Sequence, residues 1–143
     1  MKNYLPALIL ASATLVFGAD PAISEKDLIY PVDLAHNLKT ALVIHVGFPV
    51  LYRASHIAGS QFAGPASKAQ GIEELKKAVA GQPLDREIVL YCGCCGDRCP
   101  NTRPAAAALR ALGFTHVKTL ALGENLQADW ADKGFPTEKH AGN

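Results

Sequence analysis

The sequence has no concentrated patch of lysine and arginine and no acidic tail. Its 14 basic residues nearly balance 13 acidic ones, which gives a net charge of +1 over 143 residues. Proteins that bind nucleic acid usually present a basic patch or stripe. The charge distribution therefore argues against a nucleic-acid partner and leaves a small molecule or a small protein as the expected one.

Internal repeats and low-complexity linkers are also absent from the sequence. Hydrophobic residues make up 49% of the chain and charged residues 19%. A chain of this length and composition can bury a core of ordinary size. We therefore expect one folded domain, over residues 20–143.

An apolar N-terminal stretch is too short to cross a bilayer comfortably. It covers Leu5–Phe17, follows the positive charge of Lys2 and precedes the small residues Gly18 and Ala19. These are features of a secretory signal peptide, so we expect residues 1–19 to be cleaved. The mature chain would then be periplasmic or secreted and not attached to a membrane. An uncleaved anchor is the alternative, because the cleavage site matches the Ala-x-Ala pattern only in part.

Cysteine occurs in one segment of eight residues and nowhere else in the chain. Export would place these thiols in an oxidising compartment, where they must be paired, modified or kept reduced by a partner. The segment holds four thiols and two glycines: Cys92, Gly93, Cys94, Cys95, Gly96 and Cys99.

Strand-like and helix-like stretches alternate along the chain. Strands separated by single helices indicate a parallel α/β sheet, whose ligands bind beyond the carboxyl ends of the strands. Runs rich in apolar and β-branched residues predict strands over 41–46, 87–91 and 116–122. Apolar residues at helical spacing, with proline or glycine near the ends, predict helices over 31–38, 49–54, 67–80, 104–112 and 125–133.

The strand over 87–91 leads directly into Cys92, on a loop that precedes the helix over 104–112. A thiol in this position is well placed to be a nucleophile. Backbone N–H groups and the helix dipole would lower its pKa and stabilise an anion bound there. Gly93 and Gly96 would let the loop curl around it.

Three segments resemble the single-domain rhodanese-like family. The segment 41–60 is similar to the family's strand, short helix and Gly-His-Ile-Pro-Gly-Ala turn, and 88–92 to the strand that carries its catalytic cysteine. Parts of 105–136 resemble its next helix, Gly-Phe turn and closing Trp segment. The resemblance implies a three-layer α/β/α fold with a central, mostly parallel sheet. It also implies a sulfurtransferase or sulfane-sulfur carrier that forms a persulfide on Cys92, without a cofactor or a bound metal.

Two departures indicate an exported, Cys-rich variant of this family. The first strand ends in His45-Val46-Gly47 where the family has Asp-Val-Arg. The loop is longer, and Arg98 follows Cys92 at Cys-x5-Arg spacing where the family has Cys-x4-Arg. We therefore expect a small sulfur-containing substrate or a thiol partner protein and do not name thiosulfate as the donor.

Several side chains near this loop are candidates for supporting roles. Arg98 and Arg103 are candidates for binding an anionic donor, with a solvated surface arginine as the alternative. His45 could replace the missing Asp as a hydrogen-bond partner of the loop, but a satisfied core histidine is the more ordinary interpretation. His56 is expected to be structural, and Trp130 is expected to fill the core.

The other three cysteines leave further functions open. Cys94, Cys95 or Cys99 could resolve a Cys92 persulfide, or Cys92 could form a thiol–disulfide relay with Cys95 or Cys99. Cys92-x-x-Cys95 has the spacing of redox pairs, and Cys95-x3-Cys99 is a second possible pair. A structural disulfide is equally expected after export. The thiolates also suit Cu(I) or Zn, although neighbouring Cys94 and Cys95 are not expected to face one ion easily. The Cys-x5-Arg spacing suggests a phosphatase, but Cys99 replaces the Ser or Thr needed after Arg98.

Overall fold

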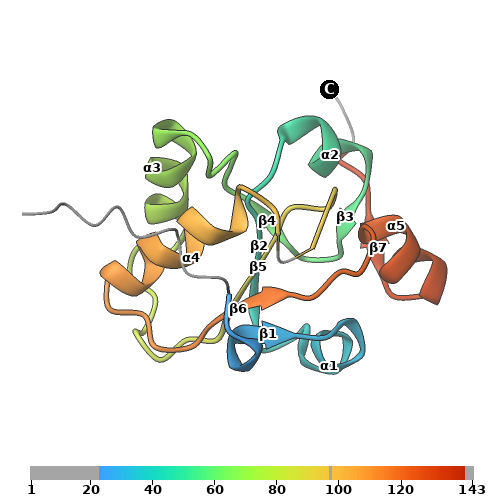
Figure 1. Cartoon of the computed structure of the whole chain (residues 1–143), viewed down its shortest axis with the longest axis horizontal. Helices are drawn as coiled ribbons and strands as arrows, with labels where there is room; N and C mark the ends of the chain where they lie inside the picture. Colours follow the sequence, from blue (N-terminus) through green and yellow to red (C-terminus); the bar gives the residue numbers. More distant parts are fainter. Residues whose placement is uncertain (1–22, 97, 141–143) are drawn as a thin grey trace, which may run out of the picture.

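The structure, a computed structural model, describes residues 23–96 and 98–140 (Figure 1). The predicted signal peptide over 1–19 and Asp97 lie outside these ranges. A five-stranded sheet with the order β1-β6-β5-β2-β4 forms the centre, and every pairing within it is parallel. Its strands are β1 (Leu28–Ile29), β2 (Leu42–His45), β4 (Gln61–Phe62), β5 (Ile88–Tyr91) and β6 (Val117–Leu120).

Helices cover both faces of this sheet, which confirms the predicted three-layer α/β/α architecture. In Figure 1, α3 and α4 lie on one side of the strands, and α1 and α5 lie on the other. The helices are α1 (Pro31–Asn37), α2 (Pro49–Ala54), α3 (Ala69–Ala78), α4 (Thr102–Ala111) and α5 (Leu126–Asp129), with short 3-10 turns at Glu25–Asp27 and Ala131–Lys133.

The sheet separates two hydrophobic cores, because side chains alternate between its two faces along each buried strand. In β5, Ile88 and Leu90 face the core beneath α3 and α4, whereas Val89 and Tyr91 face the core beneath α1 and α5. Trp130 belongs to the second core and has no exposed surface, as predicted. With β5 between β2 and β6, the carboxyl end of this strand lies in the middle of the sheet edge.

A second, two-stranded sheet holds the C-terminal part of the chain against the middle. It pairs β3 (His56–Ile57) with β7 (Thr137–Glu138) in antiparallel fashion. His56 is buried in this sheet and hydrogen-bonds through Nδ1 to the carbonyl oxygen of Tyr52 at 2.8 Å. The predicted structural role of His56 fits this placement.

The predicted helix over 125–133 is wrong, because the chain breaks at Trp130 into α5 and a 3-10 turn. The Trp130 backbone leaves helical geometry, with φ −125° and ψ −65°. The buried indole donates from Nε1 to the carbonyl oxygen of Pro136 at 2.9 Å. Tertiary packing of the indole therefore overrides a helical sequence pattern.

Helix α4 begins at Thr102, two residues before the predicted start at Pro104. Proline is tolerated in a first helical turn, where its missing N–H has no intrahelical partner.

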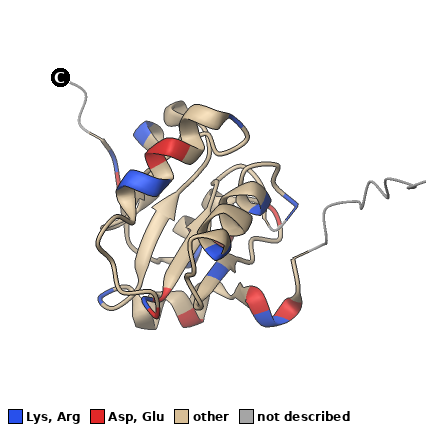
Figure 2. Ribbon diagram, turned by 90° about the vertical axis from the view of Figure 1, so that its left-hand side faces the viewer, with Lys and Arg blue, Asp and Glu red and all other residues tan. Residues whose placement is uncertain are grey.

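No helix in the described ranges is long and apolar enough to span a bilayer. Basic and acidic residues are interspersed over the helices and loops in Figure 2.

Candidate active site

The cysteine segment begins at the carboxyl end of β5, and the side chain of Tyr91 fixes that end. The Tyr91 hydroxyl accepts a hydrogen bond from the Ile57 N–H at 3.0 Å and lies 2.8 Å from Ser60 Oγ. Burial raises the pKa of Tyr91, so the phenol stays neutral. Hydrogen bonds of its hydroxyl therefore join Tyr91, the residue before Cys92, to the β3 segment. The sequence did not predict these bonds.

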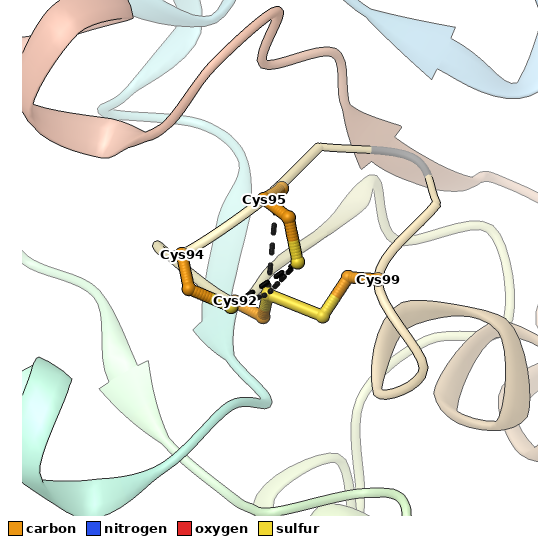
Figure 3. A group of neighbouring side chains, drawn as sticks. All are labelled: Cys92, Cys94, Cys95 and Cys99. Carbon is orange, nitrogen blue, oxygen red and sulfur yellow. Dashed lines mark hydrogen bonds between the residues drawn. A yellow bond between two sulfur atoms is a disulfide. The ribbon is translucent and has the colours of Figure 1, made fainter.

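A disulfide joins Cys92 to Cys99 (Figure 3). Both residues are fully buried, whereas Cys94 is exposed and Cys95 is half-buried, and both of these remain free thiols. The sequence leaves Cys95 and Cys99 open as the redox partner of Cys92, and the structure pairs Cys92 with Cys99. The loop brings the two ends of the segment together and leaves Cys94 and Cys95 as free thiols.

The two free thiols converge on Cys92. The Sγ atoms of Cys94 and Cys95 lie 3.3 and 3.7 Å from Cys92 Sγ and 3.1 Å from each other. Burial, and then the neighbouring Cys94 thiol, raise the pKa of Cys95 to about 11, so Cys95 is protonated near neutral pH. The expectation that neighbouring Cys94 and Cys95 cannot share one ion easily is wrong, because the loop curls their side chains toward one point.

Glycines let the loop pack closely on the sheet edge. Gly93 has a positive φ of 82°, a conformation that L side chains rarely adopt. A Cβ on Gly96 would collide with the carbonyl oxygen of Leu122, which follows β6. The carbonyl oxygen of Gly93 also accepts the Leu126 N–H at 2.9 Å, so the loop is bound to the start of α5. Both predicted glycines are needed for the curl, and their role in anion binding stays a prediction.

His45 lies beneath this loop at the end of β2. Its Nδ1 accepts a hydrogen bond from the Gly47 N–H at 3.2 Å, and its ring packs edge-on against Tyr91 with centroids 4.9 Å apart. Burial lowers the pKa of His45 to about 4, so the ring is neutral at pH 7. Since Nδ1 accepts, Nε2 carries the proton, and this buried atom has no hydrogen-bond partner among the described residues.

The Nε2 atom of His45 is directed toward the cysteine loop. A Cβ built on Gly93 would lie 3.3 Å from it. The histidine is thus a core residue, as the ordinary interpretation had it, but only one of its two nitrogens is satisfied. Its role as a support for the loop stays a prediction.

The two candidate arginines lie in different surroundings. Arg98 is exposed on the cysteine loop. Arg103 is half-buried and lines a cavity of about 600 Å³ together with Ile72 and Pro104, a cavity that none of the four cysteines lines. Binding of an anionic donor by either arginine stays a prediction.

A pocket of about 350 Å³ opens beside the exposed thiol. Its lining includes Gly93 and Cys94, Leu51 and Ala54 of α2, and Leu126 of α5. Arg98 and Arg103 are not among the residues that line it. Of the four cysteines, only Cys94 lines this pocket.

Two polar residues at the start of α4 hold Cys99, and sequence reasoning missed both. Fully buried Asn101 donates from Nδ2 to Cys99 Sγ at 3.7 Å and accepts the Ser67 N–H at 2.9 Å through Oδ1. Thr102 Oγ1 donates to the carbonyl oxygen of Cys99 at 3.1 Å. An asparagine just before a helix is the only signal that the sequence offers, and it suggests a helix cap that Asn101 does not make.

A parallel sheet covered on both faces, with a cysteine directly after its central strand, defines an α/β domain with a thiol site at the carboxyl edge. The family model described as Rhodanese-like domain matches residues 31–125. The chain therefore belongs to the rhodanese-like domain family, which at family level fits a sulfurtransferase or sulfur carrier.

Solved structures of such domains share the fold. A rhodanese-like domain from Anabaena sp. is 24% identical, with a TM-score of 0.56, and the match covers 82% of this chain and 86% of that one. A rhodanese-related protein from Thermoplasma volcanium is 23% identical, with a TM-score of 0.53 and coverages of 78% and 96%.

A thiosulfate sulfurtransferase from Pseudomonas aeruginosa is also similar. It is 27% identical with a TM-score of 0.60, and the match covers 79% of this chain but only 19% of that much longer one. A search of curated proteins gave no match.

Proposed function

We propose that the protein transfers or carries sulfane sulfur and that Cys92 forms the persulfide. The position of Cys92 carries this proposal, since it directly follows the central strand of a rhodanese-like domain. The similarity to a thiosulfate sulfurtransferase supports sulfur chemistry on this fold. The sulfur donor is left open, because His45 and Gly47 stand where the resemblance led us to expect Asp and Arg.

The Cys92–Cys99 disulfide is the resting, oxidised form in this scheme. Two electrons from a dithiol partner reduce it, and the partner leaves as a disulfide. The Cys92 thiolate then attacks the outer sulfur of thiosulfate or a polysulfide. A new S–S bond forms on Cys92, the donor's S–S bond breaks, and sulfite or a polysulfide shorter by one sulfur leaves with the electron pair.

The persulfide has two outcomes. An acceptor thiolate that attacks its outer sulfur takes that sulfur and restores the Cys92 thiolate. Cys99 can instead attack the inner sulfur, which forms the Cys92–Cys99 bond and releases hydrosulfide. The disulfide is thus the expected product of a persulfide that meets no acceptor.

A thiol–disulfide relay is the second candidate. It is favoured by the exposed Cys94 thiol, whose Sγ lies 3.3 Å from a disulfide sulfur. The signal-like features of residues 1–19 support export of the mature protein. In an oxidising compartment, either function would require a partner that supplies reducing equivalents.

Intact-mass measurement distinguishes these functions. The reduced, desalted protein is mixed with thiosulfate or polysulfide, and the mass is recorded for the variants Cys99→Ser and Cys92→Ser. We expect added sulfur in Cys99→Ser, because Cys99 can no longer resolve the Cys92 persulfide, and no added sulfur in Cys92→Ser. Loss of two hydrogens without added sulfur in Cys99→Ser would overturn the transfer function in favour of the relay. Added sulfur on Cys92→Ser would overturn the assignment of Cys92.

A further inference from the structure

We propose that the reduced cysteine segment is a binding site for one monovalent copper ion, held by Cys92, Cys94 and Cys95. This departs from the expectation that the chain binds no metal. That expectation relied in part on the argument that neighbouring Cys94 and Cys95 would not face one ion. The convergence of these side chains in Figure 3 removes that argument.

The sulfur positions lie close to those of such a site. The three Sγ–Sγ distances are 3.3, 3.7 and 3.1 Å. Three metal–sulfur bonds of about 2.3 Å in one plane need Sγ–Sγ distances of about 4 Å. Once reduction frees Cys92 from Cys99, the three sulfurs therefore need to spread by less than about 1 Å to bind one ion.

The donor set selects a soft ion. The group of potential ligands contains four sulfurs within 4.8 Å of one another and no histidine or carboxylate, among the residues described. Thiolates select soft ions such as Cu(I) over hard cations. The convergence of three sulfurs suits the trigonal coordination that Cu(I) accepts.

Cys99 is the reason to prefer copper over zinc. A structural zinc site requires four ligands in a tetrahedron. Asn101 donates a hydrogen bond to the Cys99 sulfur at 3.7 Å, on the side of α4. We therefore place Cys99 outside the trigonal set, as the residue that releases Cys92 when the disulfide is reduced.

Copper binding releases protons, because the ion binds the thiolate and not the thiol. The exposed Cys94 beside the 350 Å³ pocket provides the route by which a donor thiol can pass the ion on.

The test is an anaerobic titration of the reduced protein with Cu(I) in competition with a chromophoric Cu(I) chelator. We expect one equivalent to bind. Cys94→Ser and Cys95→Ser should each lower the affinity at least as much as the roughly 10- to 100-fold loss typical of outer-shell partners. Cys99→Ser keeps all three ligands and serves as the matched control, with an expected affinity close to wild type.

Circular dichroism checks that each variant is folded. Absence of Cu(I) binding by the folded, reduced wild type would overturn the site. An equal loss in Cys99→Ser would overturn the trigonal set in favour of four ligands. Zn(II) that displaces bound Cu(I) at equal concentration would overturn the choice of ion. None of these readouts depends on sulfur transfer, so the site and the proposed function can fail separately.

Discussion

The carbonyl oxygen of Cys92 lies against the α-carbon of Gly47, so closely that a Cβ on Gly47 would be 2.6 Å from it. The glycine at position 47, where the resemblance led us to expect arginine, therefore has a structural reason. Only glycine leaves room for the cysteine loop to pack on the end of β2. Restoring the family's arginine here would displace the loop.

Replacing Gly47 with alanine should destabilise the fold by about 1–3 kcal/mol, the usual cost of forcing extra atoms into a packed site. Urea unfolding of the oxidised protein measures this cost. Gly123→Ala is the control, since a Cβ there meets only the Asp129 carboxylate, at 3.8 Å. A Gly47→Ala variant as stable as Gly123→Ala would show that the loop does not rest on β2.

Replacing Asn101 with alanine leaves the Ser67 N–H and the Cys99 sulfur without their partner. The bond to Ser67 is only partly buried, so its loss costs about 0.5–1.5 kcal/mol, the usual net contribution of one hydrogen bond. We expect a loss of that size in urea unfolding. Asn101→Asp keeps the acceptor for the Ser67 N–H and should recover part of it. Equal stability of the alanine variant and wild type would contradict this role.

His45 should make stability depend on pH. Its pKa is lowered to about 4 in the folded protein, chiefly by burial, against an ordinary value of 6.5. Between these values the unfolded chain binds more protons than the folded one. With respect to His45, the free energy of unfolding is therefore highest above pH 6.5, and it decreases as the pH falls toward 4.

Urea midpoints measured at pH 7 and pH 5 test this. The midpoint of His45→Gln should fall less than that of wild type over this interval. Exposed His36 supplies the control, and His36→Gln should keep the wild-type dependence. Parallel profiles for His45→Gln and wild type would mean that the buried ring does not resist protonation.

The two free thiols should react at different rates. Cys94 is exposed, whereas burial and then Cys94 raise the pKa of Cys95 to about 11. Since the thiolate is the nucleophile, iodoacetamide at pH 8 should modify Cys94 first. Peptide mass spectrometry of the oxidised protein follows both sites. Because Cys94 raises the pKa of its neighbour, Cys94→Ala should speed modification of Cys95, and an unchanged rate would contradict that coupling.

The central strands could be predicted from the sequence because runs such as 87–91 are largely apolar, short and bounded by turn residues. Helix α2 was predicted with its observed bounds, since Pro49 suits a first helical turn. Strands β1 and β7 have only two residues each and leave no periodic signal. Pairing across the chain determines them, and a local pattern cannot report it.

Less of the candidate site could be predicted from the sequence. Proximity to a strand end indicates Cys92 as the candidate nucleophile, but the spacing leaves both Cys95 and Cys99 open as its redox partner. The observed pairing with Cys99 depends on how Gly93 turns and on how closely Gly96 approaches Leu122. Such contacts are set by packing between distant segments, so spacing alone cannot give them.

The four sulfurs differ in depth as well as in bonding. Cys94 is exposed, Cys95 is half-buried, and Cys92 and Cys99 have no exposed surface. Of the four cysteines, only Cys94 lines the pocket of about 350 Å³. In this oxidised form a partner protein can therefore contact the Cys94 sulfur directly, whereas the Cys92–Cys99 disulfide is covered.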